Sequence, residues 1–149
     1  MVASPEQLNE MVNYLMGFAS QMLLEAGEFY PLAALVNREG TVEALGAHTG
    51  EERPQSADVY QLLVQGLKAR VEGGDAIAIG IAVDVNIPPP FESPLPDGVR
   101  ITLETEGNSR LIYFPYEPAK GGLVKKTPPR FAEPFAVETP SDFFANPTN

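Results

Sequence analysis

The residues best suited to chemistry lie close together in the first third of the chain. His48 is the only histidine, and Glu51 and Glu52 follow it after two intervening residues. A histidine beside carboxylates can serve in acid–base catalysis, and Tyr30 could form the wall of a pocket next to them. We therefore take Tyr30, His48, Glu51 and Glu52 as the candidate ligand-binding residues. The simpler interpretation is an exposed loop whose acidic residues precede a helix, with Phe29 and Tyr30 as an aromatic plug where the chain enters a sheet.

The rest of the sequence argues against an enzyme. It contains no cysteine, which excludes disulfides, thiolate nucleophiles and cysteine metal sites. A single histidine cannot build a paired-histidine zinc or iron site, and the D-x-D-x-D-G calcium pattern is absent. The G-x-S-x-G, G-x-x-x-x-G-K-[ST] and G-x-G-x-x-G patterns are also missing. We expect no catalytic residue, no metal and no cofactor.

The charge of the chain limits its partners. Its 149 residues include 20 acidic and 10 basic ones, a net charge of −10. Phosphate binding needs clustered Lys and Arg, so nucleic acid is a poor partner. The charge serves solubility, or it attracts a basic partner protein. The start MVASPEQLNE does not resemble a signal peptide, and the apolar run AIAIGIAV is much shorter than the ~20 residues of a membrane span. These features predict a cytoplasmic protein without a membrane partner.

Two helices would have to position the candidate site. Ser4 can cap the first one, Pro5 suits its first position, and Gln7 completes a capping box. An apolar stripe at spacings of three and four follows as far as Gly27, a suitable left-handed stop. The second helix begins near Ser56 and ends at the glycine pair 73–74.

Alternation of side chains predicts five strands. Residues 29–36 and 41–47 form a hairpin, 75–87 form a central strand, and residues 99–104 and 110–116 form a second hairpin. In the central strand, isoleucine and valine share one face while alanine and glycine share the other, against which a helix backbone can lie close. The sequence thus predicts an α+β domain over 1–117, with a five-stranded antiparallel sheet, two main helices and the order α-β-β-α-β-β-β.

Residues 118–149 differ in composition from the rest of the chain. They are rich in Pro and Gly, which predicts an irregular C-terminal tail. The same segment contains Phe131, Phe135, Phe143 and Phe144, and a tail exposed to water would not need four phenylalanines. We expect the tail to be strapped across the domain or across a partner.

Two resemblances add to this prediction. The stretch GEFYPLAALV followed by HTGEERP is similar to a pattern in small uncharacterised bacterial proteins, in which E-F-Y-P-F-A precedes T-G-D-E-x-P and a helix; here Leu32 replaces the Phe and Glu51 the Asp. This likeness implies a bacterial origin and a shared fold. As topology over residues 5–117, the element order resembles roadblock and profilin-like folds, and many roadblock-type proteins dimerise and act as scaffolds.

Three functions remain as hypotheses. The first is a non-enzymatic protein-interaction module that forms a homodimer. Its interface residues would be Ile77, Ile79, Ile81, Phe131 and Phe135. The second is an acidic immunity or chaperone-like protein that neutralises a basic partner. The third is an enzyme or small-ligand-binding protein that uses the His48 loop.

Overall fold

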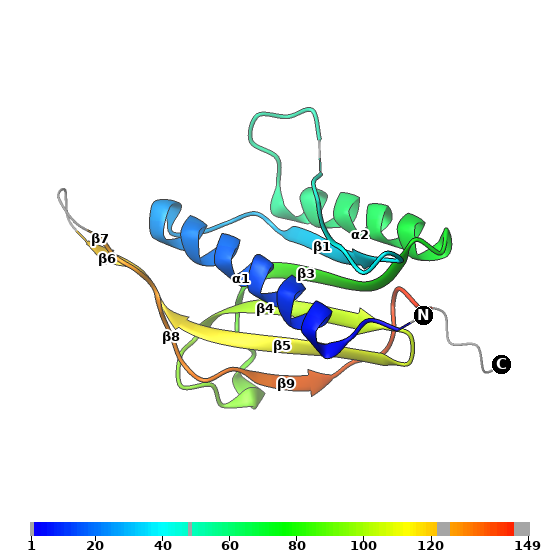
Figure 1. The fold of residues 1–149 in the computed structure, drawn as a ribbon. Coiled ribbons are helices and arrows are strands. Elements are labelled where there is room, and N and C mark those ends of the chain that lie inside the picture. The colour runs from blue at the N-terminus through cyan, green and yellow to red at the C-terminus, as the bar shows by residue number, and fades with distance from the viewer. Residues whose placement is uncertain (1, 48, 122–125, 145–149) are drawn as a thin grey trace.

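The described chain folds into a main curled antiparallel sheet with two long helices, and a separate two-stranded sheet lies outside it (Figure 1). A computed structural model describes residues 2–47, 49–121 and 126–144. In chain order the elements are α1 Pro5–Ala26, β1 Leu32–Asn37, β2 Val42–Leu45, α2 Ser56–Glu72, β3 Ala76–Asn86, the 3-10 turn η1 Pro89–Phe91, β4 Asp97–Thr105, β5 Asn108–Glu117, β6 Lys120–Gly121, β7 Lys126–Thr127, β8 Arg130–Phe131 and β9 Phe135–Glu138. The predicted α+β class is confirmed.

Helix α1 begins and ends as its sequence predicts. The Ser4 hydroxyl accepts a hydrogen bond from the Gln7 backbone N–H at 3.1 Å, and the Gln7 side chain accepts one from the Ser4 N–H at 2.8 Å. This capping box pairs two donors that a helix start leaves free. At the other end Gly27 has φ 77°, the left-handed conformation that glycine adopts without a steric cost.

Helix α1 packs on one face of the sheet. Its fully buried side chains are Met11, Leu15, Ala19 and Leu23. They contact the face of β3 that carries small residues, and a Cβ built on Gly80 would lie 2.9 Å from Leu15 Cδ1. The predicted close approach of a helix to this face is confirmed.

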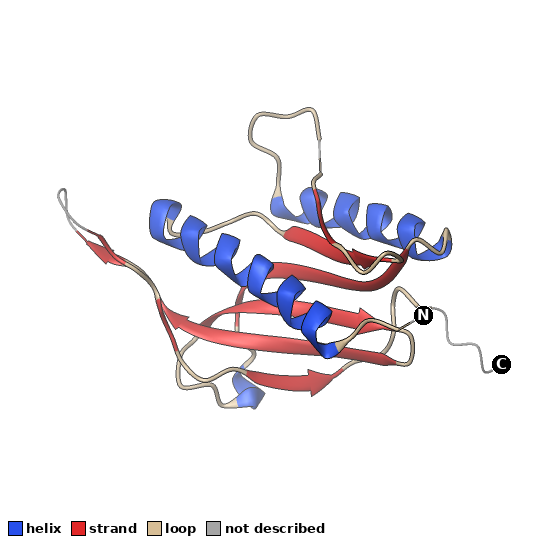
Figure 2. Cartoon of the chain, viewed as in Figure 1, coloured by secondary structure: helices blue, strands red, loops and turns tan. Residues whose placement is uncertain are grey.

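Helix α2 packs on the opposite face of the sheet, beside β1 and β3 (Figure 2). It presents Val59, Leu63 and Leu67 to Ile79 and Ile81, the large residues of β3. Its N-cap is Gln55, which makes no side-chain capping bond, so Ser56 is the first residue of the helix. The positions of α1 and α2 explain the two-faced sequence of β3, since each face contacts a different helix.

A bulge interrupts the regular pattern at the start of β3. Val36 pairs with Ala78 but the next residue, Asn37, pairs with Ala76. The extra residue Ile77 reverses the alternation. Ala76 therefore belongs to the cluster under α2, and Ile77 packs against the cluster under α1. The sequence predicted the reverse for these two residues.

The C-terminal segment adds strands that were not predicted. Among the described residues, the main sheet has the strand order β2-β1-β3-β4-β5-β8, and β9 also pairs with β5, so the predicted count of five is too low. The outer edge of β5 would otherwise expose unpaired backbone groups. Prolines interrupt the added strands and keep them to two and four residues, which hid them in the sequence.

No helix within the described ranges is both long and apolar enough to cross a membrane.

Candidate functional site

An apolar cavity of about 430 Å³ opens between α1, the start of α2 and the end of the β1–β2 hairpin. Three aromatic residues on its wall are each a little under half exposed: Tyr14 at 42%, Phe18 at 48% and Tyr30 at 47%. Leu45 and Gly46, at the end of the edge strand β2, form part of another side. We call this cavity the aromatic groove.

Local structure explains how the aromatic side chains meet. Tyr14, Phe18 and Met22 follow one another at four-residue spacing, so they form one row along α1. Tyr14 and Phe18 are exposed beside the buried row that begins at Met11, whereas Met22 at the end of their row packs against the core. Tyr30 precedes Pro31 in the link from α1 to β1, on the wall of the same groove.

A second cavity, of about 410 Å³, adjoins the aromatic groove. The two share the wall residues Met22, Phe29, Tyr30 and Pro54. The additional wall residues of the second cavity are Ala26, Glu28, Ser56 and Asp84. Because two of these are carboxylic acids, we call this cavity the acidic end of the groove.

Asp84 on β3 is fixed by a residue of β5, two strands away in the sheet. Tyr116 Oη donates a hydrogen bond of 2.7 Å to Asp84 Oδ1. Burial raises the pKa of Asp84; the bond from Tyr116 lowers it in part, and the nearby charges of Asp97 and Glu28 raise it further. The pKa of Tyr116 is also raised, first by its own burial and then by its bond to Asp84. The site therefore has a half-buried carboxyl group whose charged form is disfavoured by burial and by the acids near it.

The sequence-based ligand site consists of Tyr30, His48, Glu51 and Glu52. Tyr30 lies on the groove, as a ligand wall requires. His48 lies outside the described residues. Glu51 and Glu52 are exposed in the loop before α2, where the Glu51 N–H donates to Thr49 Oγ1 at 3.1 Å. Neither glutamate is among the described wall residues of the two cavities, which include Pro54 from the end of this loop and, in the second cavity, Ser56 at the start of α2.

The five residues predicted for a dimer interface contact their own chain. Ile79 and Ile81 are fully buried beneath α2, so they are core residues in this structure. Ile77 is half-buried at the bulge. Phe131 is 37% exposed with its ring centroid 6.0 Å from that of Tyr116.

Phe135, the fifth of these residues, belongs to an aromatic cluster on the face of β5. Its ring stacks on Tyr113 with centroids 5.2 Å apart, and Phe91 from η1 contacts both rings. The phenylalanines at 131 and 135 thus attach the tail to the sheet.

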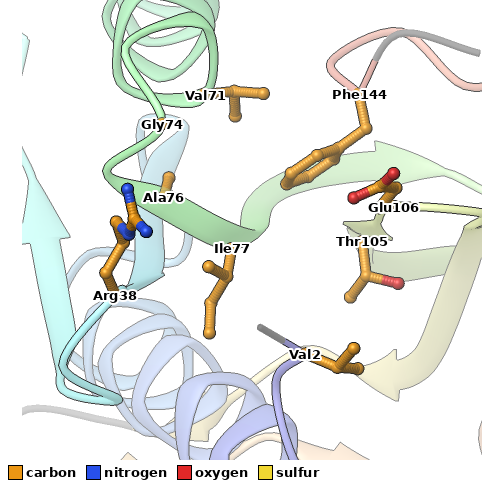
Figure 3. Close-up of a pocket in the computed structure, with 9 residues that line it drawn as sticks. All are labelled: Val2, Arg38, Val71, Gly74, Ala76, Ile77, Thr105, Glu106 and Phe144. Atoms are coloured by element: carbon orange, nitrogen blue, oxygen red, sulfur yellow. The ribbon is translucent and has the colours of Figure 1, made fainter. Parts of the chain in front are cut away.

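Another cavity, of about 570 Å³, lies at the opposite end of the sheet (Figure 3). Ile77 forms part of its wall, with Val71 and Phe144 above it in the figure. Arg38 and Glu106 stand on opposite sides of the opening. Both charged side chains are exposed at the rim, and the apolar wall is small beside that of the aromatic groove, so this cavity is the weaker candidate.

Sequence reasoning missed Glu104, which is 1% exposed on β4. Its carboxylate accepts hydrogen bonds from the backbone N–H groups of three successive residues, at 3.1 Å from Asp142 and 2.8 Å each from Phe143 and Phe144. The hydroxyls of Ser109 and Ser141 also donate to it. Residues 141–144, which we call the strap, are thereby fixed across the sheet, with Phe143 buried beside α2.

The periodicity of the sequence indicated neither the groove nor the bonds between Glu104 and the strap. Tyr14 and Phe18 are large aromatics outside the main apolar stripe of α1, and this was the available signal for the groove. Glu104 alternates with Leu103 as a solvent-facing residue of a strand would, so its burial had no local signal. Within the described part of the chain, no group of three or more His, Cys, Asp or Glu is placed to hold a metal ion.

Comparisons of the chain with protein-family models, with curated proteins and with solved structures gave no match.

Proposed function

We propose that this protein is a non-enzymatic interaction module whose aromatic groove binds an extended segment of a partner protein. The observation that carries the proposal is the convergence of Tyr14, Phe18 and Tyr30, each more than 40% exposed, on one cavity. Isolated exposed apolar residues are ordinary, whereas a grouped set of aromatics beside a concave surface is typical of protein-binding sites.

The position of β2 favours an extended segment. β2 is the last strand of the sheet on this side, and β1 is its only neighbour there in the described structure. A strand of a partner can add to such an edge through backbone hydrogen bonds, and its alternate side chains can then enter the groove. Leu45 and Gly46 place that edge next to the aromatic wall.

Charge favours a basic segment over a second copy of this chain. The net charge is −10, and Glu28 and Asp84 line the acidic end. A second copy would bring the same acidic surface against this one, whereas a segment with Lys or Arg would be attracted to it. Neutralising or chaperoning a basic protein is therefore one form that the proposed function can take.

The proposal can be tested by selecting binders from a random peptide library displayed on phage. We expect the enriched peptides to combine apolar with basic residues. Phe18→Ser and Tyr14→Ser should each weaken the affinity of a synthetic selected peptide about 30-fold, as expected when an interface aromatic worth about 2 kcal/mol is truncated. Isothermal titration calorimetry would measure this change.

Leu62→Ser is the matched control, because Leu62 is an apolar residue 37% exposed on α2 that does not line the groove. It should bind the peptide as the wild type does. Peptide affinity that is insensitive to Phe18→Ser and Tyr14→Ser would contradict the proposal. So would a dimer in light scattering that becomes a monomer with Phe18→Ser, since the groove would then be occupied by a second copy.

A further inference from the structure

We infer that the acidic end of the groove is a subsite for one cationic side chain, a lysine or an arginine, of the bound segment. This inference rests on the proposed function and specifies the ligand chemistry of the same site. The two cavities share four wall residues, and we place the cationic side chain so that it enters from the groove and ends beside Asp84 and Glu28.

The shape and chemistry of the walls suit such a side chain. Met22 and Phe29 provide an apolar surface for the methylene stem, which lysine and arginine bury readily. The exposed ring of Tyr30 can contact the cation, since aromatic rings attract cations at their faces. The carboxylates of Glu28 and Asp84 then meet the charged group where the wall becomes polar.

Asp84 is prepared to receive a hydrogen bond. Its bond from Tyr116 occupies Oδ1 and fixes the carboxyl group, and in the described structure Oδ2 has no protein donor. The two ion pairs found among the described residues both involve Arg70, which binds Glu43 and Asp75. The acidic end therefore contains carboxylates without a described cationic partner, and a ligand cation would supply one.

Two small probes of matched shape can test the subsite. 4-Phenylbutylamine has an aromatic ring for the groove and an ammonium group for the acidic end, and 4-phenylbutanol replaces the ammonium with a hydroxyl. In NMR titrations we expect the amine to bind about tenfold more tightly than the alcohol, as for one charge-assisted hydrogen bond. Asp84→Asn should remove this preference. Glu39→Gln, in the β1–β2 turn, changes the net charge equally and should preserve it.

The outcomes separate the subsite from the groove. Equal affinities of the two probes for the wild type would overturn the subsite while leaving the groove supported, and so would a preference that survives Asp84→Asn. If neither probe shifts the ring resonances of Tyr14 and Phe18, the groove itself is not a binding site, and the subsite is overturned with it.

Discussion

At the scale of single residues, the bonds of Glu104 predict a large effect for a small chemical change. Glu104→Gln replaces a carboxylate oxygen with an amide NH₂, which would face N–H and O–H donors and leave some of them unpaired. We expect a loss of about 1–3 kcal/mol in the free energy of unfolding, measured by urea denaturation. Amide hydrogen exchange at residues 142–144 should also become faster, because these N–H groups lose their acceptor.

Glu106→Gln is the control for this prediction. Glu106 is two residues further along the chain but is exposed in the turn after β4. Its substitution should leave both measurements close to those of the wild type. Equal effects of the two substitutions would show that the buried carboxylate does not hold the strap.

Asp84 makes the stability of the protein depend on pH in a defined direction. The pKa of its carboxyl group is raised in the folded state, first by burial and then by Asp97 and Glu28, so the folded protein favours the protonated form. Protonated Asp84 therefore contributes favourably to the free energy of folding at low pH. This contribution is lost as the pH rises from about 4, the ordinary pKa of an aspartate, through the raised pKa of the folded state. Asn can still accept the hydrogen bond of Tyr116 but carries no charge.

The stability of Asp84→Asn relative to the wild type should therefore increase between pH 3 and pH 7. Urea denaturation of both proteins across this range would show it. Glu39→Gln, an exposed substitution of the same charge, should give a difference that changes little over the range. A relative stability of Asp84→Asn that falls with pH would contradict the assigned burial of this carboxyl group.

At the scale of elements, the contact between α1 and β3 predicts opposite effects for two glycines. Gly80→Val would place methyl groups against Leu15 and Met11 in a filled core, which we expect to cost about 1–3 kcal/mol. Gly17→Ala lies on the exposed side of α1 with open space around it, and should stabilise the protein by about 0.5–1 kcal/mol. Thermal unfolding of the two variants would measure both, and stabilisation by Gly80→Val would contradict the close packing.

The elements that sequence predicted well have strong local signals. The capping box at Ser4 and the stop at Gly27 determine α1, and the alternation in β3 determines which face each helix covers. The bulge at Ile77 could not be predicted, because it depends on the register with β1. Strands β8 and β9 are short and bordered by prolines, so only their pairing with β5 defines them.

The candidate site was predicted only in part for a similar reason. Tyr30 was identified from a local aromatic pair, and the structure places it on the groove. Tyr14 and Phe18 join it only because α1 turns their row toward the same opening. Asp84 belongs to the site through its bond to Tyr116, which connects β3 to β5 across β4. Contacts between distant segments have no signature in a single sequence.

At the scale of the whole molecule, the C-terminal segment is part of the sheet and should contribute to stability. A chain ending at Thr139 keeps β9 and loses the strap. We expect it to lose at least about 2 kcal/mol in the free energy of unfolding, the amount expected from exposing Phe143. A chain ending at Glu117 also loses β8 and β9. It should lose more stability and aggregate, since the edge of β5 becomes free.

Urea denaturation and light scattering of the two shortened chains would measure these effects. The predicted domain boundary at residue 117 makes the competing claim that residues 1–117 fold without the tail. If the chain ending at Glu117 is monomeric and as stable as the full chain, that boundary is correct and the added strands are accessory.

The bonds between Glu104 and the strap also set a sequence of events during synthesis. The donors of Ser141 and Phe144 come 37 and 40 residues after the carboxylate that they bind. At about 5–20 residues per second, a ribosome needs roughly 2–8 s to produce them after Glu104. Throughout that interval the nascent β4 carries a charge that it cannot yet bury. This part of the sheet must therefore stay hydrated and open until the later segment leaves the ribosome.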